Sequence, residues 1–218
     1  MVRAPDDATA SERVTKSLEA RGLRLSPEQR SKVVALACDL SRPEDFGLSP
    51  ERLAELQEKL TLVIHSAWAV NFNIPVQSFE DQHIRATHAL IRLCQRVQTP
   101  DPARFFFCSS VSSAGGMPRP GTVLERSVAD PTHAQGTGYG RSKYVAEHIV
   151  RNAAMGAGAD ARVLRIGQLI GDTKVGEWNA TEGVPMTIQT AVTLGALPIL
   201  DEVSQRSLYH SCSKNWAQ

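Results

Sequence analysis

Two residues one helical turn apart, Tyr139 and Lys143, are the strongest candidates for chemistry in this chain. A Tyr and a Lys four residues apart on a helix project from the same face. An ammonium beside a phenol favours the phenolate and lowers a pKa that starts at about 10. A Tyr tuned in this way can pass a proton to or from a carbonyl or alcohol oxygen near neutral pH. The alternative is a Tyr packed on a helix whose Lys is solvated.

A cluster of serines follows an apolar segment upstream of this pair. Residues 104–109 predict a buried parallel strand, and its end is followed by further hydroxyl side chains. Such a strand delivers its last side chains to a site at the carboxyl end of the sheet. A Ser placed there can hydrogen-bond a substrate carbonyl and stabilise its developing negative charge. We assign this role to Ser110, with Ser109 as the near alternative, although serine clusters are also common in loops.

The composition predicts a single globular domain. The chain has 218 residues, 42% of them hydrophobic, and a formal net charge of +1. We therefore expect one sizeable core and no basic surface that would bind nucleic acid or an anionic membrane. No apolar run approaches the ~20 residues that span a bilayer, and no secretory hydrophobic region is present. The four Cys and six His show no metal-ligand spacing, so we predict no metal site and a cytoplasmic protein.

Strand-like and helical patterns alternate along the chain. The predicted strands cover residues 32–37, 61–65, 104–109 and 162–167, and the predicted helices cover about 8–21, 50–59, 76–98 and 137–155. Alternation of buried strands with amphipathic helices predicts parallel strands joined by right-handed crossovers. The expected fold class is therefore α/β, a Rossmann-like doubly wound parallel sheet with its site at the strand ends.

Other strand ends carry residues that could hold a dinucleotide. The small residues Ser66 and Ala67 would let ribose and phosphates approach the backbone. Asp39 could accept a hydrogen bond from an adenine amino group. Arg3 could bind the 2′-phosphate that distinguishes NADP from NAD. The alternatives are an ordinary strand-to-helix turn at 66–67, a turn-forming Asp39 and a solvated, frayed Arg3.

These residues lie in stretches that resemble a known family. The chain resembles the thioester reductase domain of fungal adenylate-forming reductases and nonribosomal-peptide-synthetase-like enzymes of secondary metabolism. That domain belongs to the extended short-chain dehydrogenase/reductase superfamily. The stretches that carry the resemblance are VRAPDDATASERV, ACDLSRPEDFGLS, VIHSAWAVNFN, FFFCSSVSSAGG, YGRSKYVAEHI, VLRIGQLIGD and GEWNATEGVPMTIQTAVTLGALPILDE. The GEWN segment is among the most specific and, with WAVN, argues against a sugar-nucleotide epimerase or steroid dehydrogenase relative.

The resemblance implies an enzyme activity, a cofactor and a set of site residues. The activity is NADPH-dependent reduction of an acyl or aminoacyl thioester, carried on the phosphopantetheine arm of a carrier protein, to an aldehyde and sometimes to an alcohol. Ser110, Tyr139 and Lys143 would be catalytic, with Lys143 also holding the nicotinamide ribose. The positions that would line the cofactor are Arg3, Asp39, Leu40, His65, Ser66, Ala67, Tyr139, Lys143, Ile166 and Gly167. Nucleic acid and membranes would play no part.

The chain departs from the family pattern at both ends. A Gly-rich phosphate loop should follow the first strand, yet the first glycine is Gly22. We therefore interpret residues 1–202 as a partial NADP-binding reductase domain without the first strand and the Gly-rich loop, and residues 203–218 as a divergent tail. We expect the chain by itself to bind NADPH poorly. The alternative function is a truncated, non-catalytic relic or interaction module that binds no cofactor.

Overall fold

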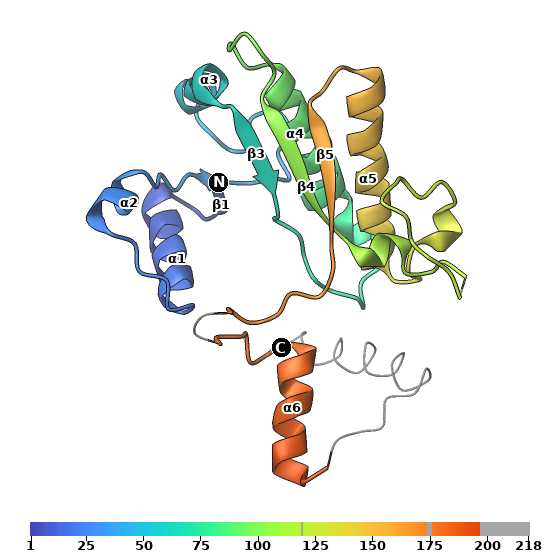
Figure 1. The fold of residues 1–218 in the computed structure, drawn as a ribbon. Coiled ribbons are helices and arrows are strands. Elements are labelled where there is room, and N and C mark those ends of the chain that lie inside the picture. The colour runs from blue at the N-terminus through green and yellow to red at the C-terminus, as the bar shows by residue number, and fades with distance from the viewer. Residues whose placement is uncertain (119, 174–175, 197–218) are drawn as a thin grey trace.

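The strands that the structure describes pair in parallel and alternate with helices (Figure 1). The structure is a computed structural model that describes residues 1–118, 120–173 and 176–196. The strands form two sheets with the orders β1-β2 and β3-β4-β5. Their bounds are β1 (Val2–Arg3), β2 (Ala37–Cys38), β3 (Leu62–His65), β4 (Arg104–Ser110) and β5 (Ala161–Ile166). This arrangement confirms the α/β class with parallel strands.

Short polar side chains begin several of the helices. The side chains of Asp6, Ser49 and Thr137 each accept a hydrogen bond from a backbone N–H three residues further on, which satisfies a donor that the first helical turn leaves free. The helical elements are α1 (Asp7–Glu19), α2 (Pro27–Ser31), α3 (Pro50–Lys59), η1 (Val76–Phe79), η2 (Glu80–Arg85), α4 (Ala86–Gln95), η3 (Val111–Ala114), η4 (Pro131–His133), α5 (Gly138–Gly156) and α6 (Gly183–Leu194).

Two predicted elements differ from the structure. The strand predicted at 32–37 is reduced to β2 at Ala37–Cys38, and a reciprocal capping box of Ser26 and Gln29 starts the short helix α2 before it. Val33 and Val34, the apolar pair behind that prediction, remain 46% and 69% exposed. The helix predicted at 76–98 is divided into a 3₁₀ turn, a π-helix and α4. Helices α2 and α6 were not predicted.

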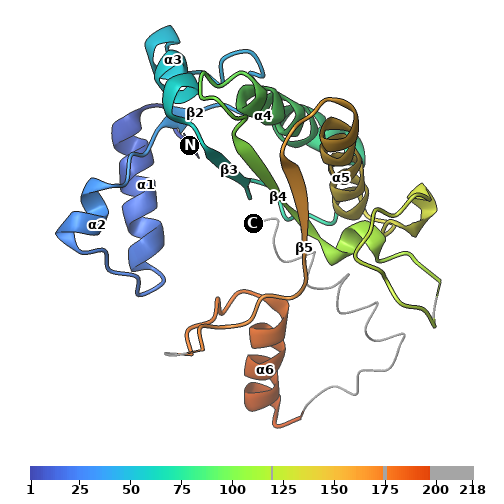
Figure 2. The ribbon, with the colours of Figure 1, turned by 45° about the horizontal axis from the view of Figure 1, so that its top comes forward.

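One face of the three-stranded sheet is covered by α4 and α5 (Figures 1 and 2). The rings of Phe105 and Phe107 on β4 are fully buried in this layer, as is Val150 of α5. Burial of side chains of this size contributes about 1.5–3 kcal/mol each. On the other face of the sheet, Ile64 and Leu164 are 62% and 44% exposed. The core therefore lies on the helical side of the sheet.

A cavity of about 750 Å³ is lined by residues of β1, β2 and β3. Among the described residues, β1 pairs only with β2 and β3 pairs only with β4, so each presents one unpaired side. The cavity therefore joins the two sheets at their edges. The predicted tail at 203–218 lies outside the described residues, and no helix in the described ranges is long and apolar enough to cross a bilayer.

Candidate active site

Helix α5 carries Tyr139 and Lys143 on its buried face. The Thr137 hydroxyl accepts a hydrogen bond from the Gly140 amide at 3.1 Å, so the helix begins immediately before Tyr139. The Tyr139 and Lys143 residues are only 8% and 3% exposed. The rings of Phe72 and Tyr139 meet edge to face with centroids 4.9 Å apart. The structure therefore places both side chains on the same buried face, and Lys143 is not a solvated surface residue.

Ser110, at the end of β4, lies beside the Tyr139 phenol. Its side chain is near enough to the phenol to act on the pKa of Tyr139, and Ser110 Oγ accepts a hydrogen bond from the Ser112 amide at 3.2 Å. Successive residues of a strand face opposite sides, so Ser109 faces away and its hydroxyl donates to Glu147. Of the two serines considered from the sequence, Ser110 is the one that the fold brings to Tyr139.

The environment of Tyr139 does not lower its pKa. Burial raises the pKa of the phenol above its ordinary value, and the interaction with the Ser110 side chain opposes that shift. The Lys143 ammonium is engaged elsewhere, because Nζ donates to the Cys108 carbonyl oxygen at 2.7 Å and lies 4.2 Å from the centroid of the Trp68 ring. The expectation that Lys143 lowers the pKa of Tyr139 is therefore wrong for this arrangement.

Lys143 itself is perturbed by its burial. Removal from water lowers the pKa of its ammonium to about 8, while interactions with Cys108 and Glu147 act in the opposite direction. A buried ammonium is disfavoured because water no longer solvates the charge. With a pKa of about 8, Lys143 keeps its charge at pH 7 yet can exchange a proton close to neutrality.

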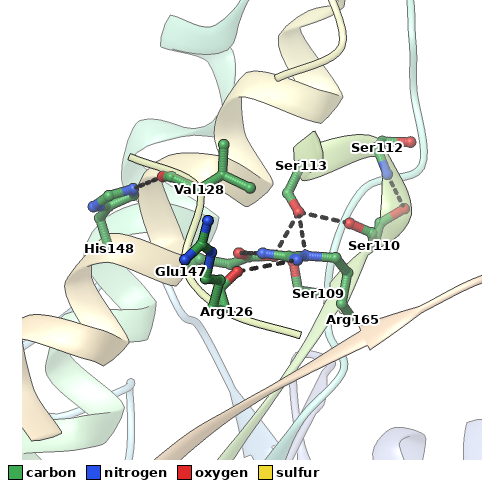
Figure 3. A network of polar contacts seen from close by, with 9 residues as sticks. All are labelled: Ser109, Ser110, Ser112, Ser113, Arg126, Val128, Glu147, His148 and Arg165. Carbon is green, nitrogen blue, oxygen red and sulfur yellow. Dashed lines mark hydrogen bonds and ion pairs between the residues drawn. The ribbon is translucent and has the colours of Figure 1, made fainter. Parts of the chain in front are cut away.

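A buried polar network lies next to Ser110 at the end of β4 (Figure 3). The Glu147 carboxylate, one turn beyond Lys143 on α5, pairs with the Arg165 guanidinium of β5 at 2.5 Å. The hydroxyls of Ser109 and Ser113 also reach this carboxylate. Sequence reasoning missed both charged residues. The spacing of four between Lys143 and Glu147 was the available signal, since it places the carboxylate on the same helix face.

The residues expected to line a cofactor separate into two groups. Six of them line the cavity between the sheets: Arg3, Asp39, Leu40, His65, Ser66 and Ala67. Ile166 instead pairs in register with Ser110 at the end of β5 and is followed by Gly167. Trp68, which sequence reasoning did not assign to the site, lines the cavity and also contacts Lys143. Its ring therefore connects the cavity with the Tyr-Lys pair.

The cavity wall carries groups of the kind that can contact the adenosine end of a nicotinamide dinucleotide. Arg3 is exposed at its wall and shares one guanidinium N–H with the Gln82 side chain at 3.0 Å, which leaves further donors for a phosphate. The buried Nε2 of His65 has no hydrogen-bond partner among the described residues, and a bound ligand can satisfy such an atom. Asp39 Oδ1 accepts from the amide and hydroxyl of Ser41 at 2.9 and 2.6 Å, so Asp39 does form the turn considered as its alternative role.

The N-terminus of α1, the first helix, does not offer a binding site for the pyrophosphate of the cofactor. The N-cap of α1 is Asp6 and its first turn contains Asp7, so acidic groups occupy the end where a helix otherwise attracts anions. The described residues therefore fit the adenosine end better than the phosphates. In the same described ranges, no group of three His, Cys, Asp or Glu side chains is arranged to hold a metal ion.

Comparison with known sequences gives a consistent set of relatives. Residues 1–209 match the NAD_binding_4 family model, described as Male sterility protein. The adenylate-forming reductase Nps9 of Serpula lacrymans is 35% identical over 188 residues, which cover 86% of this chain and 16% of that protein. An adenylate-forming reductase of Aspergillus terreus is 34% identical over 218 residues, which cover 92% of this chain and 20% of that protein. The chain thus spans a fifth or less of these two relatives.

Solved structures show the same fold. The terminal R domain from the myxalamid PKS-NRPS biosynthetic pathway superposes with a TM-score of 0.80 at 26% identity, covering 92% of this chain and 49% of that chain. The reductase domain of the aureusimine biosynthetic cluster has a TM-score of 0.63 at 21% identity and supports the fold alone. These matches confirm a Rossmann-like architecture.

Proposed function

Because the chain belongs to the NAD_binding_4 (Male sterility protein) family, we propose that it is the cofactor-binding part of an NADPH-dependent thioester reductase. The proposed substrate is an acyl or aminoacyl thioester on the phosphopantetheine arm of a carrier protein. The observation that carries the proposal is the contact of Ser110 with Tyr139, one helical turn from a buried Lys143. This trio stands at the carboxyl end of β4, where parallel sheets bind ligands.

Each member of the trio has a role that follows from its environment. NADPH, when bound, supplies the hydride for the carbonyl carbon. The Ser110 hydroxyl orients the thioester carbonyl beside the phenol. Tyr139 donates a hydrogen bond or proton to the carbonyl oxygen, and the raised pKa of its phenol suits a group that must be protonated at neutral pH. The charge of Lys143 compensates the negative charge that develops on the substrate oxygen. Loss of the thiol from the resulting hemithioacetal leaves the aldehyde.

The preference for NADPH over NADH is supported by Arg3. This residue lines the cavity together with Asp39. The pKa of the Asp39 carboxyl is lowered mainly by hydrogen bonds from Ser41, and to a smaller extent by the charges of Arg42 and Arg3. A guanidinium can pair with a 2′-phosphate through two parallel hydrogen bonds. NADH lacks that phosphate, so with NADH bound the Arg3 guanidinium would keep its hydrogen bond to Gln82 and gain no phosphate contact.

The test is a reductase assay on the protein that contains this chain. NADPH oxidation is followed with an acyl thioester loaded on a carrier protein, and the aldehyde is trapped and identified by mass spectrometry. We expect stoichiometric oxidation and aldehyde formation, both slowed by about 10²–10⁴-fold in Tyr139→Phe. A folded protein that binds NADPH yet oxidises none with any loaded acyl group would contradict the proposal.

A second candidate is a non-catalytic interaction module. Within the described residues, β1 and β3 each pair on one side only at the cavity, which favours this function because an unpaired strand side is a template for another polypeptide. Calorimetry with NADPH on the protein that contains this chain separates the two functions. Micromolar affinity supports the reductase, and a folded protein without measurable affinity supports the module.

A further inference from the structure

A buried ion pair lies next to the segment that carries Ser110, and the proposed reaction steps do not use it. Glu147 and Arg165 come from α5 and β5, and their side chains are 5% and 16% exposed, with Nη2 and Oε2 2.5 Å apart. Loss of either partner leaves an uncompensated charge inside the protein. The ion pair therefore fixes how the two elements pack at this point, and removal of one partner is costly.

The same pair holds the residues on both sides of Ser110 (Figure 3). The hydroxyls of Ser109 and Ser113 lie 2.5 and 2.6 Å from Glu147 Oε1. Arg165 Nε donates to Ser113 Oγ at 3.0 Å. Ser113 Oγ also lies 2.8 Å from the Ser110 carbonyl oxygen, and its single proton serves one of its two acceptors at a time. One carboxylate thus contacts the chain at Ser109, directly before Ser110, and at Ser113, three residues after it.

We propose that Glu147 and Arg165 are positioning residues: their ion pair clamps residues 109–113 against α5 and so holds the Ser110 hydroxyl against the Tyr139 phenol. They act through Ser109 and Ser113, not by touching the carbonyl site. The catalytic consequence rests on the proposed function, whereas the clamp is a property of the folded chain and is measurable without turnover.

The first test is amide hydrogen exchange followed by NMR in Glu147→Gln. The informative amides are those of Ser112, which donates to Ser110 Oγ, and Gln135, which donates to the Ser112 carbonyl at 2.9 Å. We expect both to exchange about tenfold faster, the effect of losing one charge-assisted contact. The amide of Leu53 in α3, bonded to Ser49 O at 3.0 Å, reports the remote part of the fold and is expected to keep its rate.

Three further variants sharpen the test. Glu125→Gln removes the same charge from an exposed loop residue and is expected to leave all three rates unchanged. Arg165→Lys keeps a charge but loses the planar fork, and we expect it to accelerate the Ser112 and Gln135 amides less than Arg165→Met does. The double variant Glu147→Gln/Arg165→Met is expected to match the larger single effect, since the two residues act as a unit.

The outcomes separate the clamp from the reaction. Unchanged Ser112 and Gln135 exchange in Glu147→Gln and Arg165→Met, or equal acceleration at Leu53, overturns the proposal. If Glu147→Gln does not fold, Arg165→Lys supplies the same comparison. In an active protein, we expect Glu147→Gln to lower kcat about tenfold. The KM for NADPH should stay within twofold of the wild-type value. A wild-type protein without reductase activity would reject the proposed function, and the exchange rates would still decide the clamp.

Discussion

The Lys143 ammonium lies 4.2 Å from the centroid of the Trp68 ring, although 75 residues separate the two along the chain. The indole Nε1 donates to Ser142 Oγ at 3.1 Å, which fixes the ring beside the helix that carries Lys143. The negative face of an indole attracts a cation. A buried ammonium thus has a carbonyl oxygen and an aromatic face in place of water.

This relationship predicts the response of Lys143 to changes at Trp68. Trp68→Leu removes the aromatic face, so we expect the pKa of Lys143 to fall further below its value of about 8, by up to about one pKa unit. Titration of ¹³Cε-labelled lysines by NMR measures it, with Lys143→Arg identifying the resonance. Trp68→Phe keeps an aromatic face and is the matched control. An unchanged pKa in Trp68→Leu would show that the ring does not stabilise the charge.

The proposed proton donor predicts a large effect on turnover at Tyr139. In the active protein, Tyr139→Phe removes the phenol hydroxyl and should lower kcat by about 10²–10⁴-fold. Tyr144 on the same helix donates only to the Ala129 carbonyl oxygen at 2.8 Å, so Tyr144→Phe is the matched control and should change kcat little. Steady-state NADPH oxidation measures both. A Tyr139→Phe enzyme within twofold of wild type would remove Tyr139 from the mechanism.

Arg3 predicts the choice between the two nicotinamide cofactors. Arg3→Ala should weaken NADPH binding by roughly 10- to 100-fold, the effect of losing a hydrogen-bonded charge, and leave NADH binding nearly unchanged. Calorimetric titration with each cofactor measures the difference. Arg104→Ala, at an exposed position where β4 begins, is the control. Equal affinity of the unmutated protein for the two cofactors would end this assignment.

His65 predicts a dependence of stability on acid. Burial, with smaller effects from the charges of Lys143 and His83, lowers the pKa of His65 from 6.5 to about 4. Between these pH values the unfolded chain binds more protons than the folded chain. The free energy of unfolding should therefore fall by about 3 kcal/mol as the pH drops from 6.5 towards 4.

Urea unfolding at a series of pH values tests this dependence. His65→Phe keeps a ring among the neighbouring aromatic side chains and should lose this part of the pH dependence. His88→Gln, at an exposed position of α4, should retain it. A wild-type protein and a His65→Phe variant with parallel pH profiles would show that His65 is not the titrating group.

Local structure along this chain was largely readable from the sequence. Helix α3 has the predicted bounds, because Ser49 and Pro50 mark its start and its pattern is amphipathic. The strands β3, β4 and β5 lie within one residue of prediction, since buried apolar runs of that length read as parallel strands. The spacing of Tyr139 and Lys143 was enough to place both on one helix face.

What the tertiary structure decided is the surroundings of those residues. Whether Val33 and Val34 join a strand depends on burial that no local pattern reports. The pKa of Tyr139 depends on which groups the Lys143 ammonium contacts. Here the ammonium contacts the Cys108 carbonyl of β4 and the Trp68 ring, which follows β3. The pairing of Glu147 with Arg165 likewise requires α5 to lie on β5. Periodicity encodes which side of an element is buried, whereas electrostatics depends on distances between elements far apart in the chain.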